Sequence, residues 1–595
     1  MSLTPLRYRI FAADPAAHHF EVSCTVPCPA AGGQRFALPA WIPGSYLIRE
    51  FARHVIAIRA EAGGKPVRLD KLDKHTWQAA PVKNGTALTV TMTVYAWDLS
   101  VRGAHLDATH GFFNGTSVFL RVLGQEDAPC LVDLQPPAGR EFKGWRVATS
   151  LPPARGERGE RGAAKALGFG LYRAANYDEL IDHPVEMGTF THFSFEAGGV
   201  PHEVAITGRH DCDTERLAAD LAKICTAQID FFGRPAPMAR YVFLVTAVGD
   251  GYGGLEHRAS TALICKRADL PARGDAGISD GYRRFLGLCS HEYFHTWNVK
   301  RIKPAAFVPY DLERENYTPL LWAFEGFTSY YDDLFLLRSG VIDRRGWLEL
   351  LTDTLGAVRK APGRQLQSLA DSSFDAWIKY YRPDENTPNA VVSYYAKGAL
   401  LGLALDLTLR ATGRTSLDDV MRELWRRHGQ TGIGVGDDDI RKIAEERSGL
   451  SLKRFFADYA EGTRELPLER LLAGAGVRLE WIADPKAKRG VDLGVRTKTE
   501  NGELVLATVY PGGAAHAAGL SAGDALVALD GLRVTPTNLD VLLGRKRPGE
   551  TVEMMAFRRD ELMRFTLTLA APPADSARLT PAAKPNALRR AWLGG

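Results

Sequence analysis

The stretch HEYFH at residues 291–295 constrains this chain more than any other, because its spacing has chemical meaning only on a helix. Residues four apart lie on one face of an α-helix, so His291 and His295 can each direct a ring nitrogen at one ion. Glu292 then lies beside that ion, where it can hold a water molecule. The preceding YRRFLGLC places apolar residues at helical spacing, as a buried helix requires. We therefore predict a zinc-binding helix rather than a chance grouping of polar residues.

A catalytic zinc ion takes three protein ligands and keeps one position for water. Our candidate for the third ligand is Glu325, which lies in the apolar, aromatic stretch LLWAFEGFTSYYDDL. A carboxylate in such surroundings is costly unless it is paired or bound to a metal. Glu313 and Glu315 compete for this role, but the charged run DLEREN around them is typical of solvated carboxylates. We predict one Zn²⁺ per chain, bound through Glu325 and the two histidines.

The 595 residues are too many for one hydrophobic core, and three or four domains are expected. The 45% of hydrophobic and 24% of charged residues are typical of a globular protein and argue against wholesale disorder. The 74 basic and 70 acidic residues nearly balance, so we expect no nucleic-acid partner and no membrane surface as a partner.

The first residues, MSLTPLRYRIFAADPAAHHF, lack a basic segment followed by an apolar run, and no stretch approaches the roughly 18 apolar residues of a membrane span. The seven cysteines are scattered and include no CxxC pair, which favours free thiols in a reducing compartment. We expect a cytoplasmic protein.

Changes in hydrophobic periodicity predict a multidomain α+β protein. Alternating apolar and polar residues indicate an antiparallel β domain over 1–165, which ends in the charged, Gly-rich stretch PPARGERGERGAAK. Mixed strands and amphipathic helices follow over 166–405, and helical periodicity continues over 406–480. Short strands with Gly turns indicate a small β-rich domain over 481–573. The Ala- and Pro-rich tail, 574–595, is expected to be flexible.

HEYFH followed by WAFEGFTSY resembles the gluzincin zinc aminopeptidases, in which a second helix supplies the glutamate ligand. The insertion VKRIKPAAFVPYDLERENYTPL makes the gap before that glutamate longer than in the leucyl and alanyl aminopeptidases. It is similar instead to the glycyl aminopeptidase family, which carries a C-terminal PDZ domain. LPAWIPGSYLIREF and HEYFHTWNVKRIKP look like further signatures of that family. The resemblance covers nearly the whole chain, and it implies a β-sandwich-like N-terminal domain, a thermolysin-like catalytic domain and a PDZ domain.

GYGGLEHRAS at 251–260 is similar to the G-x-M-E-N loop with which these aminopeptidases grip the free amine of a substrate. The resemblance implies that Glu256 pairs with the charged N-terminus, while Gly253 and Gly254 let the backbone approach the peptide. The sequence departs from the pattern at Leu255 and His257, which leaves the backbone contacts open.

SYYAKGALL contains a Y-A-K-G that resembles the Y-x-K-G of these enzymes, in which the tyrosine hydroxyl hydrogen-bonds the developing oxyanion. The matching residue is Tyr395, and the neighbouring Tyr394 stays an alternative. VDLGVRT resembles the carboxylate-binding loop of PDZ domains, and AGLSAGDALVALDG matches their later core. The resemblance implies that a peptide C-terminus can add there as a strand, although a domain that only packs on the catalytic unit stays possible.

The leading hypothesis is a zinc aminopeptidase that removes the first residue from peptides with a free N-terminus. Glu292 acts as general base, and the resemblance implies a small first residue, Gly or Ala. One alternative is a PDZ-assisted zinc endopeptidase in protein quality control, which would tolerate a blocked N-terminus. Another is a non-catalytic peptide-binding scaffold.

Overall fold

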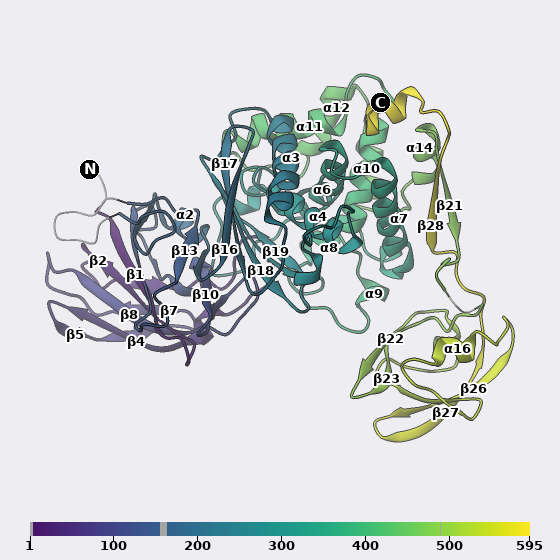
Figure 1. Ribbon diagram of the computed structural model, residues 1–595, viewed down its shortest axis with the longest axis horizontal. Coiled ribbons are helices and arrows are strands. Elements are labelled where there is room, and N and C mark those ends of the chain that lie inside the picture. Colours follow the sequence, from purple (N-terminus) through teal and green to yellow (C-terminus); the bar gives the residue numbers. More distant parts are fainter. Residues whose placement is uncertain (1–3, 155–162, 488–489, 595) are drawn as a thin grey trace. The chain divides into compact units, whose positions relative to one another are not determined.

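The structure is a computed structural model that describes residues 4–154, 163–487 and 490–594 (Figure 1). The middle of the Gly-rich stretch predicted as a domain boundary, residues 155–162, lies outside the described residues. The chain forms two compact units. The first comprises Met1–Asn316, Tyr331–Ile342 and Met421–Gly436, and the second comprises Tyr317–Tyr330, Asp343–Val420 and Asp437–Gly595. Since both units are assembled from separate segments, the domain limits at 165, 405 and 480 stay predictions.

The first unit begins with the predicted β domain, whose largest sheet has seven strands (Figure 1). The order across this sheet is β14 (Gly170–Ala174), β12 (Cys130–Gln135), β1 (Leu6–Asp14), β2 (His19–Val26), β8 (Leu88–Tyr95), β4 (Val55–Ala62) and β5 (Lys65–Val67). Alternate residues of β1 are buried, as the sequence pattern predicts. The expected antiparallel pairing holds between β1 and β2, whereas β1 and β12 pair in parallel.

Two smaller sheets complete this domain. One has the order β13 (Arg146–Thr149), β15 (Val185–Gly188), β10 (His110–Phe113) and β9 (Ala104–Leu106). The other has the order β11 (Arg121–Val122), β3 (Arg35–Ala37), β7 (Thr76–Ala79) and β6 (Leu69–Lys71). The short helices α1 (Gly115–Val118) and α2 (Tyr177–Ile181) connect strands of these sheets.

A five-stranded sheet follows in the first unit, with the order β16 (Thr191–Ala197), β17 (Val200–Thr207), β18 (Tyr241–Val248), β20 (Ser260–Lys266) and β19 (Gly253–Glu256). The apolar run of β18 is almost wholly buried between two parallel neighbours. Two long helices, α3 (Thr214–Phe232) and α4 (Asp280–Phe294), accompany this sheet (Figure 1). They are joined by Gln228, whose side-chain amide donates to the Ser290 carbonyl over 3.0 Å.

The second unit is mainly helical before residue 477. Its helices include α5 (Leu321–Phe324), α7 (Arg344–Lys360), α8 (Leu369–Phe374), α9 (Thr387–Ala390), α10 (Ala396–Arg410), α12 (Asp439–Ser448), α13 (Lys453–Tyr459) and α14 (Leu468–Gly474). Helix α10 is apolar on nearly every side and is correspondingly buried. Two helices, α6 (Gly326–Arg338) and α11 (Leu417–Leu424), begin in the second unit and end in the first. Among the described residues, no helix combines the length and apolar composition that crossing a bilayer requires.

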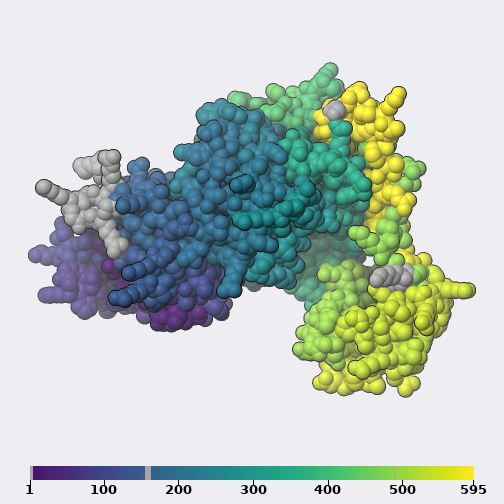
Figure 2. Space-filling view, in the orientation of Figure 1, coloured from purple at the N-terminus to yellow at the C-terminus, as the bar shows by residue number. Residues whose placement is uncertain are grey.

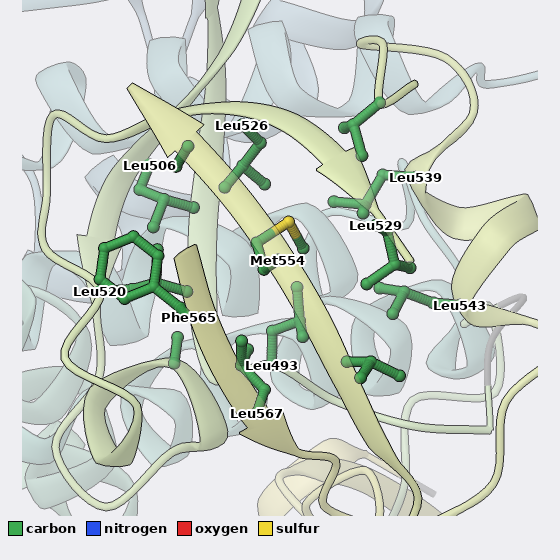
Figure 3. Packing of buried hydrophobic residues seen from close by; sticks show 14 of the residues in the cluster. Leu493, Leu506, Leu520, Leu526, Leu529, Leu539, Leu543, Met554, Phe565 and Leu567 are labelled. Atoms are coloured by element: carbon green, nitrogen blue, oxygen red, sulfur yellow. The ribbon is translucent and has the colours of Figure 1, made fainter. Parts of the chain in front are cut away.

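The C-terminal β-rich domain has the strands β22 (Val495–Glu500), β23 (Glu503–Val509), β24 (Ala525–Leu529), β25 (Leu532–Arg533), β26 (Thr551–Arg558) and β27 (Glu561–Thr568), with helices α15 (Ala514–Ala517) and α16 (Leu539–Leu543). Its own core gathers Leu506, Leu526, Met554 and Phe565 from four strands (Figure 3). These elements confirm the multidomain α+β fold with a PDZ-like domain near the C-terminus.

The prediction that the tail, 574–595, is flexible is wrong for the residues that the structure describes. Strand β28 (Ser576–Pro581) pairs antiparallel with β21 (Val477–Ile482), and helix α17 (Ala587–Leu593) follows it. In Figure 2 the yellow C-terminal residues lie against teal and green residues of the chain. Trp592 anchors α17, because its buried indole N–H donates to the Tyr330 hydroxyl over 2.9 Å and its ring meets Trp347 edge-on. The Ala- and Pro-rich composition concealed one short strand and one anchoring tryptophan.

Candidate metal centre and substrate site

The two predicted histidine ligands lie at the C-terminal end of α4, as the HEYFH spacing predicts. His291 belongs to the last turn, and His295 caps the helix in a helical conformation. Their Nε2 atoms face each other over 3.0 Å. The other ring nitrogen of each is held in place: His291 Nδ1 lies 2.9 Å from Asp332 Oδ2, and His295 Nδ1 lies 2.7 Å from the Asn298 carbonyl oxygen.

These partners fix where the protons are. A carbonyl oxygen and a carboxylate oxygen both accept, so each neutral ring carries its proton on Nδ1 and presents a lone pair at Nε2. The lone pairs of His291 and His295 therefore point toward each other. Such an arrangement repels unless a cation lies between the nitrogens, and carboxylate and carbonyl partners behind imidazoles are typical of metal sites. The geometry of the two rings therefore fits a metal ion.

Glu325 lies between α5 and α6 and is only 2% exposed. Its backbone is helical, and its carbonyl accepts from the Ser329 amide over 2.8 Å, so it continues into α6. Asp332, which holds His291, follows seven residues later, which is two turns along the helix and on the same face. The competing Glu313 is already engaged, since it forms an ion pair with Arg121.

Three predicted site residues of the first unit converge. The carboxylates of Glu256 and Glu292 and the ring of His295 offer donor atoms that all lie within 4.8 Å of one another, and all three side chains are buried. Strand β19, which begins at Gly253, runs close to Glu292: a Cβ added at Gly254 would lie 2.1 Å from Glu292 Oε1. Gly254 is therefore needed for the strand to approach Glu292, while the predicted approach of this backbone to a peptide stays a prediction.

Two contacts from the N-terminal domain were not predicted from the sequence. Gly44, in the aromatic loop WIPGSY, has φ +94° and lies so close to Glu256 that an added Cβ would be 2.4 Å from Oε2. Arg102 donates through its guanidinium to the Gly254 carbonyl over 3.1 Å. A Pro-Gly pair in an aromatic loop could have indicated Gly44, but no local signal indicates Arg102.

The departure at His257 has a structural explanation. The Asp182 carboxylate forms close contacts with three side chains: His257 Nδ1 at 2.9 Å, Arg258 Nε at 2.7 Å and Lys300 Nζ at 2.7 Å. Burial alone would raise the pKa of Asp182, but Lys300 and Arg258 hold it well below its ordinary value. Because Lys300 lies in TWNVKRIKP, that stretch fastens the end of the histidine helix to the strand that carries Glu256.

Tyr394 and Tyr395 differ in their surroundings within the second unit. Tyr394 is fully buried, whereas Tyr395 is only partly buried, precedes α10 directly, and places its hydroxyl 3.2 Å from that of Tyr381. Burial and then the charge of Glu325 raise the pKa of Tyr395 well above its ordinary value. The hydroxyl of Tyr395 therefore keeps its proton and can donate it in a hydrogen bond.

Comparisons with known proteins relate the chain to aminopeptidases. Three family models match the chain: the Peptidase M61 N-terminal domain over residues 7–189, the M61 glycyl aminopeptidase over 284–401, and a PDZ domain over 491–569. A solved aminopeptidase N family protein from Idiomarina loihiensis is 43% identical with a TM-score of 0.93, and the match covers 99% of this chain and 100% of that one.

Two other similarities are more distant. An M1 zinc metallopeptidase from Deinococcus radiodurans is 16% identical with a TM-score of 0.49, over 78% of this chain and 95% of that one. The curated protein "Regulator of sigma-E protease RseP" from Escherichia coli is 33% identical over 137 residues, which are 23% of this chain and 28% of that protein. The chain thus spans under a third of the length of that relative.

The family models and the similarity over the whole chain define an aminopeptidase, a hydrolase of peptide bonds. Within this class the chain belongs to the M61 glycyl aminopeptidase family and carries the PDZ domain that its sequence indicates.

Proposed function

We propose that this protein removes a small N-terminal residue, Gly or Ala, from peptides whose α-amine is free. The observation that carries the proposal is the short separation between Glu256, Glu292 and His295, whose donor atoms lie within 4.8 Å of one another. The α-amine and the scissile carbonyl of an N-terminal residue are only two bonds apart, so the group that anchors the amine must lie beside the catalytic base. An endopeptidase has no use for a buried carboxylate at that point.

We further propose that His291, His295 and Glu325 hold one zinc ion per chain. Support comes from the facing Nε2 lone pairs, from the match of this donor set to catalytic zinc sites, and from the helical phase that Glu325 shares with Asp332. When bound, zinc supplies Lewis-acid polarisation of the scissile carbonyl and makes water more acidic.

The chain's own residues carry the remaining steps of the proposal. The Glu292 carboxylate accepts a proton from the attacking water and returns it to the leaving amine. The Tyr395 hydroxyl donates a hydrogen bond to the developing oxyanion. Glu256 pairs with the substrate ammonium, and burial strengthens that pair. The preference for a small first residue is supported by the glycyl family description.

The test uses p-nitroanilides of Gly, Ala and Leu, each with a free and an acetylated amine, on the zinc-loaded protein with and without a chelator. We expect cleavage of the free Gly and Ala substrates only, and loss of activity with the chelator. Glu256→Gln should raise KM for these substrates at unchanged zinc content, while Glu196→Gln, at an exposed glutamate of β16, should match the wild type. Equal cleavage of free and acetylated substrates would favour the endopeptidase, and no cleavage of any free-amine substrate would favour the scaffold.

We propose that the PDZ domain docks an extended peptide along β22. This strand pairs with β23, and no strand in the described part of the second unit pairs with its other edge. The predicted carboxylate-binding loop already contains a carboxylate, because the Gly494 amide donates to Asp492 Oδ2 over 3.0 Å. An incoming peptide C-terminus must therefore displace the Asp492 side chain, which favours a segment that binds without its terminal carboxylate.

A further inference from the structure

The second unit contains a cavity of 440 Å³ among α7, the first turn of α10, residues 465–470 and β21. One wall is apolar and is formed by Leu355, Val358, Leu400, Leu479 and Trp481. The volume lies within the range of small-molecule sites in proteins. None of the residues assigned above to zinc, to the substrate amine or to the oxyanion lines this cavity.

The polar end of the cavity carries a buried cation with spare donors. Lys397 is 2% exposed, and its Nζ donates to the Arg364 carbonyl over 3.1 Å. An ammonium group has three N–H donors, and the described residues offer Lys397 no other acceptor. Donors buried without acceptors are costly, so an external acceptor is favoured here.

A second cation lies beside the first. Arg364 is 8% exposed, and it donates to Glu465 over 2.9 Å and to the Ala361 carbonyl over 3.1 Å. Two carboxylates line the cavity: Glu465, which pairs with Arg364 over 2.9 Å, and Glu469, which accepts from the Trp481 indole N–H over 3.0 Å. Arg359 and Arg470 also line the cavity, so its four cationic side chains outnumber its two carboxylates. Burial lowers the pKa of Lys397 to about 8, so most of it is still charged at neutral pH.

We propose that this cavity is an effector site for a compact apolar carboxylate. The carboxylate accepts from Lys397 and Arg364, and the apolar body lies against Trp481 and the neighbouring leucines. A bare inorganic anion would leave that apolar wall uncovered. Two kinds of ligand carry a carboxylate on such an apolar body: the C-terminal residue of a peptide product and a medium-chain fatty acid.

The cavity is connected to the proposed catalytic residues, and this step rests on the proposed function. Lys397 lies in the first turn of α10, two residues after Tyr395. The next residue, Gly398, packs so closely that an added Cβ would lie 2.7 Å from the Trp322 carbonyl oxygen and 2.9 Å from the Gly326 Cα, which flank Glu325. The first turn of α10 is therefore packed too closely to move independently of the residues around Glu325. A ligand that binds Lys397 must either shift Tyr395 relative to Glu325 or fix the positions of both.

The experiment measures binding by calorimetry on the full-length, zinc-loaded protein, so that its outcome does not depend on peptidase activity. The probes are N-acetyl-leucine for the peptide source, octanoate for the fatty-acid source, and N-acetyl-leucinamide and octanamide as matched neutral compounds. We expect at least one carboxylate to bind with a Kd below 1 mM and its amide to bind at least tenfold more weakly. The tighter of the two carboxylates identifies the source.

Lys397→Met should weaken carboxylate binding at least tenfold, whereas Lys379→Met, at a lysine on the surface of the same unit, should not change it. This comparison separates the cavity from the zinc site, where a carboxylate could also bind. Unchanged binding in Lys397→Met, equal binding of acid and amide, or no binding of either acid at 10 mM would overturn the proposal. If Lys397→Met does not fold, Trp481→Ala takes its place: the loss of the cavity wall should weaken carboxylate binding, and unchanged binding would overturn the proposal. The rate of Ala p-nitroanilide cleavage, followed in parallel, tests the link to catalysis separately.

Discussion

Replacing Gly44 with alanine tests whether the N-terminal domain shapes the proposed amine site around Glu256. The new Cβ would lie 2.4 Å from one Glu256 oxygen and 2.6 Å from the other. To restore an ordinary contact the carboxylate must retreat by about 1 Å, and a displacement of that size at a catalytic site can cost about 100-fold in rate. The expected fall in kcat/KM corresponds to about 2.7 kcal/mol of lost transition-state stabilisation.

The matched control is Gly64→Ala, because Gly64 also has a positive φ (+74°) but has nothing within 4 Å of an added Cβ. Both variants incur the backbone strain of about 1–3 kcal/mol, and only Gly44→Ala displaces Glu256. The assay is steady-state cleavage of Ala p-nitroanilide, with thermal unfolding as the check on folding. A folded Gly44→Ala enzyme whose kcat/KM stays within about twofold of that of Gly64→Ala would refute the reasoning.

Asp332→Asn removes the carboxylate that accepts from His291 Nδ1, and we expect the metal affinity to fall about 10- to 100-fold in chelator competition. An unchanged affinity would contradict the role of Asp332 in orienting His291. Asp182→Asn leaves Lys300 buried without its partner, so urea unfolding at pH 7 should show a loss of about 3–5 kcal/mol. Because folding lowers the pKa of Asp182, its carboxylate contributes fully to the free energy of unfolding above about pH 4, and this contribution is lost as the pH falls through the folded-state pKa. The wild type and Asp182→Asn should therefore converge in stability in acid. A difference that stays constant with pH would count against the pairing. Asp492→Ala should bind peptides with a free C-terminal carboxylate more tightly in fluorescence anisotropy, and weaker binding would reverse the proposed competition. Trp592→Ala should lower the free energy of unfolding by about 3–5 kcal/mol, whereas a loss below 1 kcal/mol would mean that α17 does not anchor the chain end.

The histidine helix could be predicted from the sequence because its signal is local. An i, i+4 spacing and an apolar run define the same face in any helix, so His291 and His295 needed no tertiary information. Glu292 followed from the same motif. Glu256 was proposed for a different reason, the resemblance of GYGGLEHRAS to the amine-binding loop of the aminopeptidases, and not from a local structural signal.

The remaining contacts join segments that the chain separates widely. Gly44 meets Glu256, and Asp182 meets Lys300, only after several sheets have formed, and no periodicity encodes such pairs. The tail was misjudged for the same reason. Strand β28 is recognisable only beside β21, its partner from before the PDZ domain, because an isolated short strand has no stability of its own.

The pairing of β21 with β28 makes the PDZ domain an insertion rather than an appendage. Ile482 leaves the ribbon directly opposite Ser576, where the chain returns, and facing residues in such a ribbon have Cα atoms only about 5 Å apart. A tight two-residue turn could therefore replace everything between them and leave α17 seated. The same arrangement means that a single proteolytic cut in either connection would not release the PDZ domain, since the other strand still holds it. Two chain connections therefore hold the PDZ domain, and they restrict its rotation, and that of any peptide bound to it, far more than a single linker would.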